Sequence, residues 1–223
     1  MLKAVEGITS SESLHWINAF GLIDADDRTT DQIQELFEKR IIATKCYSVE
    51  SLYYHLDIIR FVANTYAELT GSDSDELFGT ATVNIVSYIS SHKERLCSRL
   101  SEKRVRTEIM SMLPKHTDII ENKDFELKLS LEDYFNQEVA KFDQLIYDKN
   151  LNGLIARYPV RETPVLNNIA NGLGIDRATY ESIVRKLIID DEAVLKTLRT
   201  ILGELTALII KENYAQSSRQ LRP

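Results

Sequence analysis

The chain has 223 residues, enough to bury a substantial core in one large domain or two small ones. Hydrophobic residues make up 43% and charged residues 27%, and no apolar run approaches the roughly 18 residues of a membrane span. The N-terminus lacks the apolar stretch of a secretory signal peptide, so we expect a cytoplasmic protein without membrane contact. The net charge of −7 argues against nucleic-acid binding over the whole surface, although it leaves room for a local basic groove.

The first third of the chain predicts an α/β segment. Residues 20–23 form a short apolar run that ends in an acidic cluster, as is typical of a buried parallel strand. Thr29 can cap a helix with one apolar face, and residues 41–44 form a second apolar run. Strand, helix and strand within this length predict a βαβ unit with parallel strands and a right-handed crossover.

The rest of the chain has a mostly helical pattern. We expect a helix capped by Ser48, and we place a domain boundary at the polar break that follows residue 70. The fold class is therefore an α/β segment of residues 1–70 followed by a helical region of residues 71–223. Within that region, residues 76–113 predict one long or two shorter helices that end at Pro114.

Three further patterns lie in the helical region. Residues 125–129 alternate apolar and polar side chains, which favours either a short strand or an extended lead into a helix near Leu131. Thr163 is expected to cap a helix with proline at its first position, and Asp176 is expected to cap the next one. A last helix should run from about Asp190.

The acidic cluster is the first candidate for chemistry. Asp24 and Asp26 are two residues apart at the end of a predicted strand, so their side chains should point to the same side of the sheet. At the carboxyl end of a parallel strand they would face the crevice in which open α/β sheets bind ligands. Two carboxylates this close favour a bound cation, and hard oxygen ligands suit Mg²⁺ or Mn²⁺. The alternative is an Asp-rich turn that caps the following helix.

Two stretches carry a resemblance to a known family. The segment GLIDADDRTTDQIQEL, then a short strand, then YSVESLYYHL, resembles the second half of a Toprim domain. It is similar to the domains of overcoming-lysogenization-defect-like nucleases and of Toprim effectors that work beside an ATPase. The segment LIARYPVRETPVLNNIANGLGI, residues 154–175, is similar to a stretch that follows the Toprim core in these proteins.

This resemblance implies a metal-dependent nuclease. Asp24 and Asp26 would bind Mg²⁺ or Mn²⁺, with Glu50 as a further carboxylate or an outer-shell group, although a first-turn Glu can also serve only the helix dipole. Phosphates of DNA or RNA would be contacted by basic side chains, each of which could equally be solvated or ion-paired. These basic candidates are Arg28, Lys45, Arg157 and Arg161.

The resemblance also implies partners and a context, namely phage defence together with an ATPase. No P-loop motif is present in the sequence, so we expect the ATPase to be a separate or upstream partner. A Toprim domain also needs a Glu at the end of an earlier strand, several tens of residues before the paired acids. We expect that the chain begins inside the domain, without that strand. The alternative is that Glu6, in a Glu-Gly pair, serves in a shortened version.

Two other functions remain open. A haloacid-dehalogenase-like phosphatase would use Asp24 as nucleophile and Asp26 as acid, with a later acid pair at Asp190 and Asp191 after an apolar run. That family expects Thr or Val where this chain has Arg28. The third reading is a non-catalytic helical module that docks on an ATPase or on a second copy of itself.

Overall fold

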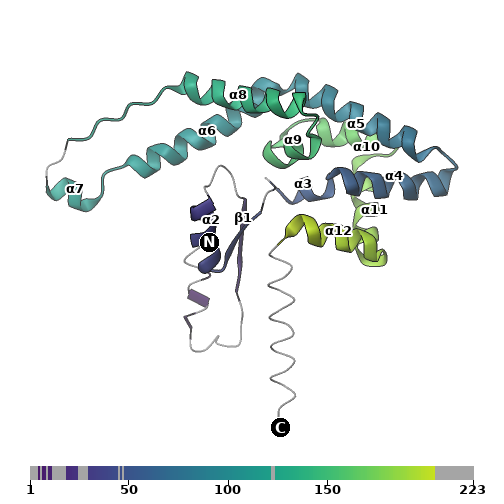
Figure 1. Ribbon diagram of the computed structural model, residues 1–223, viewed down its shortest axis with the longest axis horizontal. Coiled ribbons are helices and arrows are strands. Elements are labelled where there is room, and N and C mark those ends of the chain that lie inside the picture. Colours follow the sequence, from purple (N-terminus) through teal and green to yellow (C-terminus); the bar gives the residue numbers. More distant parts are fainter. Residues whose placement is uncertain are drawn as a thin grey trace, which may run out of the picture.

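The computed structural model contains a small α/β segment followed by a larger helical region (Figure 1). It describes residues 5, 7–8, 10–11, 19–24, 30–44, 46, 48–121 and 124–203, without the side chains of Asp24, Val49 and Glu50. This arrangement confirms the predicted fold class.

The α/β segment consists of two strands and one helix. Strand β1 (Gly21–Asp24) pairs in parallel with β2 (Ile41–Thr44), and helix α2 (Thr30–Glu38) lies between them in sequence. Ile41 and Ile42 are buried, as expected for an apolar run in a parallel pair. Arg40 has a positive φ of 58° in the turn before β2, and its carbonyl accepts a hydrogen bond of 2.9 Å from the amide of Gly21. This turn fixes the register in which both strands begin.

The helical region starts directly after the second strand. Its elements are α3 (Val49–Tyr53), α4 (Leu56–Thr70), α5 (Ser74–Ser91), α6 (Lys93–Met112), α7 (His116–Ile120), α8 (Leu131–Tyr147), α9 (Leu151–Arg157), the 3-10 turn η2 (Val160–Glu162), α10 (Val165–Gly172), α11 (Arg177–Asp190) and α12 (Glu192–Leu202).

Side-chain caps explain many of the helix starts. Asp73 accepts hydrogen bonds from two amides at the start of α5. Asp176 caps α11, as predicted, by accepting a hydrogen bond from the amide of Thr179. Ser130 caps α8 in the same way. Residues 125–129 form an extended lead into α8 and no strand, which confirms the second of the two predicted alternatives.

One hydrophobic core holds the helical region together. Helix α10 is its centre, with Val165, Leu166, Ile169 and Ala170 fully buried. The core also contains Ile59 of α4, so it includes residues on both sides of the boundary that we predicted after residue 70. Helix α4 thus packs with the region that we expected to begin at residue 71.

Helices α6 and α8 form an arm that extends away from this core, with α7 at its end (Figure 1). They are antiparallel, because Lys93 at the start of α6 pairs with Asp143 near the end of α8, and Ser101 contacts Tyr134 nearer the tip. Among the described residues, no helix is both long and apolar enough to cross a bilayer.

The close approach of α10 to α5 should limit side-chain size at Gly172. A Cβ on this residue of α10 would lie 2.8 Å from the Cα of Ala81 in α5, closer than real Cβ contacts allow. We expect Gly172→Ala to lower the free energy of unfolding by about 1–3 kcal/mol, measured by urea denaturation. Gly79→Ala is the matched control in α5, because a Cβ there meets nothing within 4 Å. An equal loss in both variants would contradict this packing.

Candidate functional site

The carboxyl ends of the two strands meet at one edge. Asp24 is the last residue of β1 and is aligned with Thr44, the last residue of β2. The Thr44 hydroxyl oxygen lies 3.2 Å from the carbonyl oxygens of both Ile23 and Cys46, so it ties the two strand ends together. The carboxyl ends of β1 and β2 therefore lie at the same edge, where open α/β sheets bind ligands.

Glu50 lies in the first turn of the helix that follows this edge. Its helix, α3, begins at Val49, five residues after the end of β2. The next residue, Ser51, is buried and donates a hydrogen bond of 3.0 Å to the carbonyl of Ile155 in α9. The backbone that carries Glu50 is therefore joined to the segment that leads into Arg157.

Several predicted site residues lie outside the described part of the chain. They are Glu6, Asp26, Arg28 and Lys45. For Asp24 and Glu50 the backbone is described but the side chain is not. The described residues contain no group of three His, Cys, Asp or Glu side chains that could hold a metal ion. Because the predicted ligands are not in that set, the metal site stays a prediction.

Arg157 is held in an ion pair inside the helical region. Its Nε and Nη2 atoms each donate a hydrogen bond of 2.7 Å to a different carboxylate oxygen of Glu138 in α8. Glu138 is 3% exposed and also accepts a hydrogen bond of 2.9 Å from the hydroxyl of Tyr158. This forked geometry fixes α9 against α8. Arg157 is thus ion-paired, which is one of the two roles that the sequence left open for it.

The same buried cluster keeps its neighbouring groups protonated. Burial, with a smaller effect from the Glu138 charge, raises the pKa of the Cys97 thiol to about 11. Burial also raises the pKa of Tyr158. Both shifts favour the protonated thiol and phenol. The polar groups of this cluster hydrogen-bond one another and stabilise the packing of α9 against α8.

Arg161 is the exposed residue of the turn η2, which follows this cluster in sequence. The neighbouring Val160 is buried, and the hydroxyl of Thr163 accepts a hydrogen bond from the amide of Val165 at the start of α10. Pro164 is the N-cap residue and α10 begins at Val165, one residue later than predicted. The packed residues on both sides hold the Arg161 backbone at the surface of the helical region.

The later acid pair required by a phosphatase lies on helices. Asp190 is the last residue of α11, and Asp191 caps α12 by accepting hydrogen bonds from the amides of Ala193 and Val194. A haloacid-dehalogenase-like site needs a strand before these acids, and the structure has a helix there. The capping role of Asp191 accounts for its position without any catalytic function.

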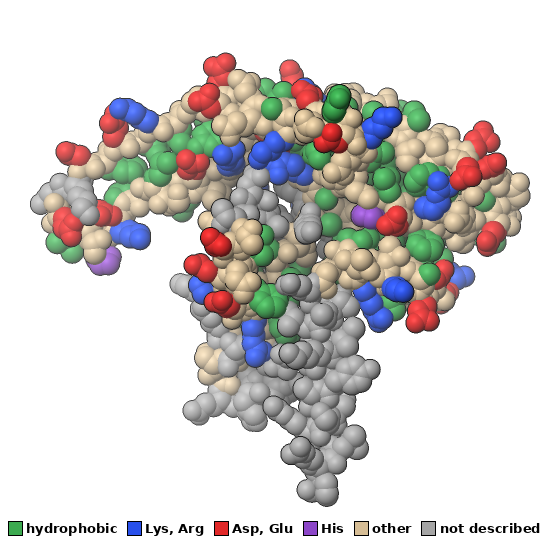
Figure 2. Space-filling view, in the orientation of Figure 1, with side chains coloured by type: hydrophobic (Ala, Val, Ile, Leu, Met, Phe, Trp, Pro, Cys, Tyr) green, Lys and Arg blue, Asp and Glu red, His purple; other side chains and the backbone are tan. Residues whose placement is uncertain are grey.

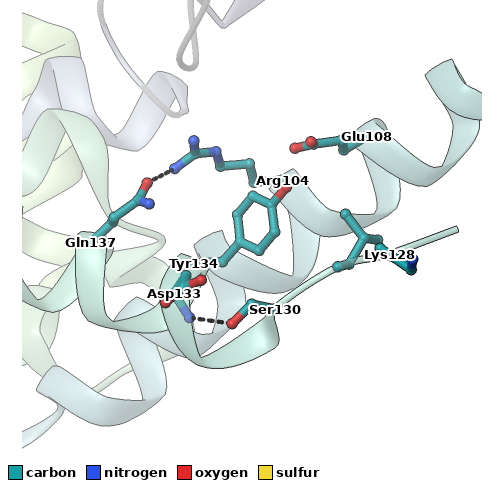
Figure 3. A pocket seen from close by; sticks show the side chains of 8 residues that line it. Arg104, Glu108, Lys128, Ser130, Asp133, Tyr134 and Gln137 are labelled. Atoms are coloured by element: carbon teal, nitrogen blue, oxygen red, sulfur yellow. Dashed lines mark hydrogen bonds between the residues drawn. The ribbon is translucent and has the colours of Figure 1, made fainter.

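A shallow pocket of about 250 Å³ lies between the helices of the arm (Figure 3). Arg104 donates a hydrogen bond to Gln137 and lies over the ring of Tyr134, while Glu108 hydrogen-bonds Tyr134 and raises its pKa. Its polar side chains largely satisfy one another, so the pocket lacks convergent groups directed at a ligand.

Sequence reasoning missed Glu138 as the partner of Arg157. The two residues are 19 positions apart on different helices, and nothing in the spacing links them. The one available signal was that Glu138 occupies the apolar face of α8, four residues before Phe142, which is also buried. A charged residue on a buried face requires a partner.

Comparison of the chain with protein-family models, with curated proteins and with solved structures found no match.

The Glu138–Arg157 pair should contribute strongly to stability. Glu138→Gln removes the carboxylate that pairs with the mostly buried guanidinium of Arg157, and we expect a loss of about 3 kcal/mol in the free energy of unfolding. Glu102→Gln is the matched control, because Glu102 pairs with Arg99 and Arg106 at the surface and should cost less than about 1 kcal/mol. Chemical denaturation measures both, and equal losses would rule out a special role for the buried pair.

Proposed function

We propose that this chain is a Toprim-type nuclease that hydrolyses phosphodiester bonds with a divalent metal ion. The observation that supports the proposal best is the position of Asp24. It ends a strand that is parallel to β2, and the chain after β2 leads within a few residues to Glu50 in the first turn of α3. An acidic residue thus ends β1 and another follows β2 in sequence, in the order that the resemblance requires.

The donor set fits a hard cation. Asp24 and Asp26 would hold Mg²⁺ or Mn²⁺ through carboxylate oxygens, and Glu50 would add a third carboxylate or orient a bound water. When bound, the ion would supply Lewis-acid stabilisation of a phosphoryl oxygen and a more acidic water. If Asp24 and Asp26 lie close together, as proposed, their like charges would also favour binding of a cation.

The substrate would be DNA or RNA, bound near the same edge. Figure 2 shows Lys and Arg side chains gathered on the underside of the arch that the helices form. Arg161 is exposed and lies in the turn that follows α9, the helix joined to α3 through Ser51. Guanidinium groups match phosphate oxygens, so Arg161, with Arg28 and Lys45, would position the backbone of a nucleic acid.

The resemblance alone supports the rest of the functional context. It suggests action beside an ATPase in phage defence; the cytoplasmic location is a separate expectation from the sequence of the N-terminus. A second candidate, a non-catalytic interaction module, is favoured by the exposed apolar side chains on the arm, such as Ile119 and Ile120, which are 66% and 74% exposed.

The acidic site can be tested by cleavage and by metal binding. Wild type, Asp24→Ala and Asp26→Ala are incubated with plasmid DNA and with RNA in Mg²⁺ or Mn²⁺, and Mn²⁺ binding is measured by calorimetry. Loss of a direct ligand should reduce cleavage by at least roughly 100-fold, because even the partners of ligands cost about 10- to 100-fold. The Mn²⁺ affinity should fall with it.

Asp31→Ala is the matched control, since Asp31 is an exposed acid in the first turn of α2. It should retain both cleavage and Mn²⁺ binding. Equal cleavage and equal Mn²⁺ affinity in wild type, Asp24→Ala and Asp26→Ala would remove the proposed site. Mn²⁺ binding that depends on these acids, without cleavage, would mean that the chain needs further residues or a partner to act.

Nucleic-acid binding by Arg161 has its own readout. We expect Arg161→Ala to weaken binding of a labelled oligonucleotide about equally for all sequences, and to reduce the salt dependence of log K by about one phosphate contact. Fluorescence anisotropy over a range of salt concentrations measures this slope. Arg185→Ala, an exposed arginine of α11, serves as control. An unchanged slope in Arg161→Ala would exclude a direct phosphate contact.

A further inference from the structure

The segment before α8 has an extended backbone. Residues 124–130 are neither helix nor strand, and residues 124–129 make no backbone hydrogen bond to any residue that the structure describes. Figure 3 shows the extended ribbon that leads past Lys128 into α8. Amides and carbonyls that an extended segment leaves unpaired are a template for pairing with another strand.

The side chains of this segment alternate like those of a strand. Phe125 and Leu127 are 48% and 40% exposed, and Leu129 continues the apolar side. Glu126 and Lys128 lie on the other side, where their charged groups are 3.0 Å apart. An extended segment with one apolar and one charged side is what a half-buried strand requires.

More apolar side chains are exposed near this segment, at the end of the arm. They come from the end of α6, from α7 and from the start of α8: Met110, Met112, Leu113, Ile119, Ile120 and Leu131. Figure 2 shows hydrophobic side chains at the surface of the arm, and in Figure 1 its end lies away from the core. The end of the arm therefore carries exposed apolar side chains among charged ones and is accessible to another molecule.

The charge pattern selects a second copy of this chain as the occupant. If two copies pair in antiparallel fashion about Leu127, Glu126 of each copy lies opposite Lys128 of the other. Phe125 then faces Leu129 of the other copy, and Leu127 faces its own equivalent. Both charged pairs are attractive, and opposite charges directly across an antiparallel pair stabilise it. Parallel pairing in register would instead place like charges side by side.

We propose that the chain dimerises through residues 124–130, which form a two-stranded antiparallel ladder across a two-fold axis at Leu127. Such a contact is isologous, because the same segment of each copy pairs with that of the other, and it closes as a dimer. The strand pairing gives direction and register, and the surrounding apolar side chains of α7 and α8 add buried area. The proposal does not depend on nuclease activity.

Charge-reversed variants test the pairing directly. Lys128→Glu places Glu opposite Glu at both positions of its own dimer, and Glu126→Lys places Lys opposite Lys. We expect each variant alone to dimerise at least about tenfold more weakly than wild type. An equimolar mixture of the two should form heterodimers with near wild-type affinity, because every cross-strand pair is again attractive. The double variant, Glu126→Lys with Lys128→Glu, should also recover.

Sedimentation velocity and circular dichroism of wild type, the single variants, their mixture and the double variant provide the measurements. Restored dimers in the mixture support the proposal, and they cannot arise from misfolding of either variant. A wild type that stays monomeric at several hundred micromolar overturns it. So does a dimer whose affinity is the same in all variants, or a mixture that dimerises no better than its components.

A cysteine at the axis tests the register. Leu127→Cys should form an intermolecular disulfide under mild oxidation, because the two introduced thiols would lie opposite each other. Glu126→Cys is the matched control and should cross-link far more slowly, since its neighbour across the ladder is Lys128. The native Cys46 and Cys97 are buried. Equal rates for both variants would contradict pairing about Leu127.

Discussion

Burial of helix α10 against α5 is the contact on which the helical region depends. The two helices approach so closely at Gly172 that a methyl group would meet the backbone of Ala81. Asn84 of α5 reinforces the contact by donating a hydrogen bond of 2.8 Å to the carbonyl of Asn168. With α10 fixed, the short turn η2 and helix α9 have little freedom, and α9 in turn is held to α8 through Arg157 and Glu138.

Because the packing of α10 is central to the helical region, residues 154–175 have a structural role as well as a resemblance to a known family. It carries part of the resemblance to Toprim nucleases, and it also contains much of the buried core, including Leu154, Ile155, Tyr158 and Leu166. Apolar side chains at these positions are needed for packing. The resemblance in this stretch can therefore reflect helical packing alone, whereas the proposed chemistry would depend on the acids near the strand ends and on exposed basic residues.

The sequence predicted local structure well where one residue decides it. The two apolar runs became parallel strands, and Asp176 became a cap, because strand pairing and capping follow from short patterns. Contacts between helices could not be predicted from the sequence in the same way. Glu138 and Arg157 are 19 residues apart, and their pairing depends on how α8 and α9 cross. The alternation at residues 125–129 left strand and extended lead equally open, since a strand needs a partner that the sequence alone does not supply.

The continuity of the core across Gly71 has a practical consequence for dissecting the molecule. The polar turn there looks like a place to cut, and its glycine has the left-handed backbone of an ordinary helix end. Helix α4 nevertheless buries Ile58, Ile59, Val62 and Ala63 against later helices. A fragment that stopped at Gly71 would expose this apolar face of α4 to water and should aggregate. A fragment that started at Gly71 would lack the residues of α4 that complete its hydrophobic core. If the two parts of the chain are expressed separately, the better division is near residue 45, directly after the end of β2.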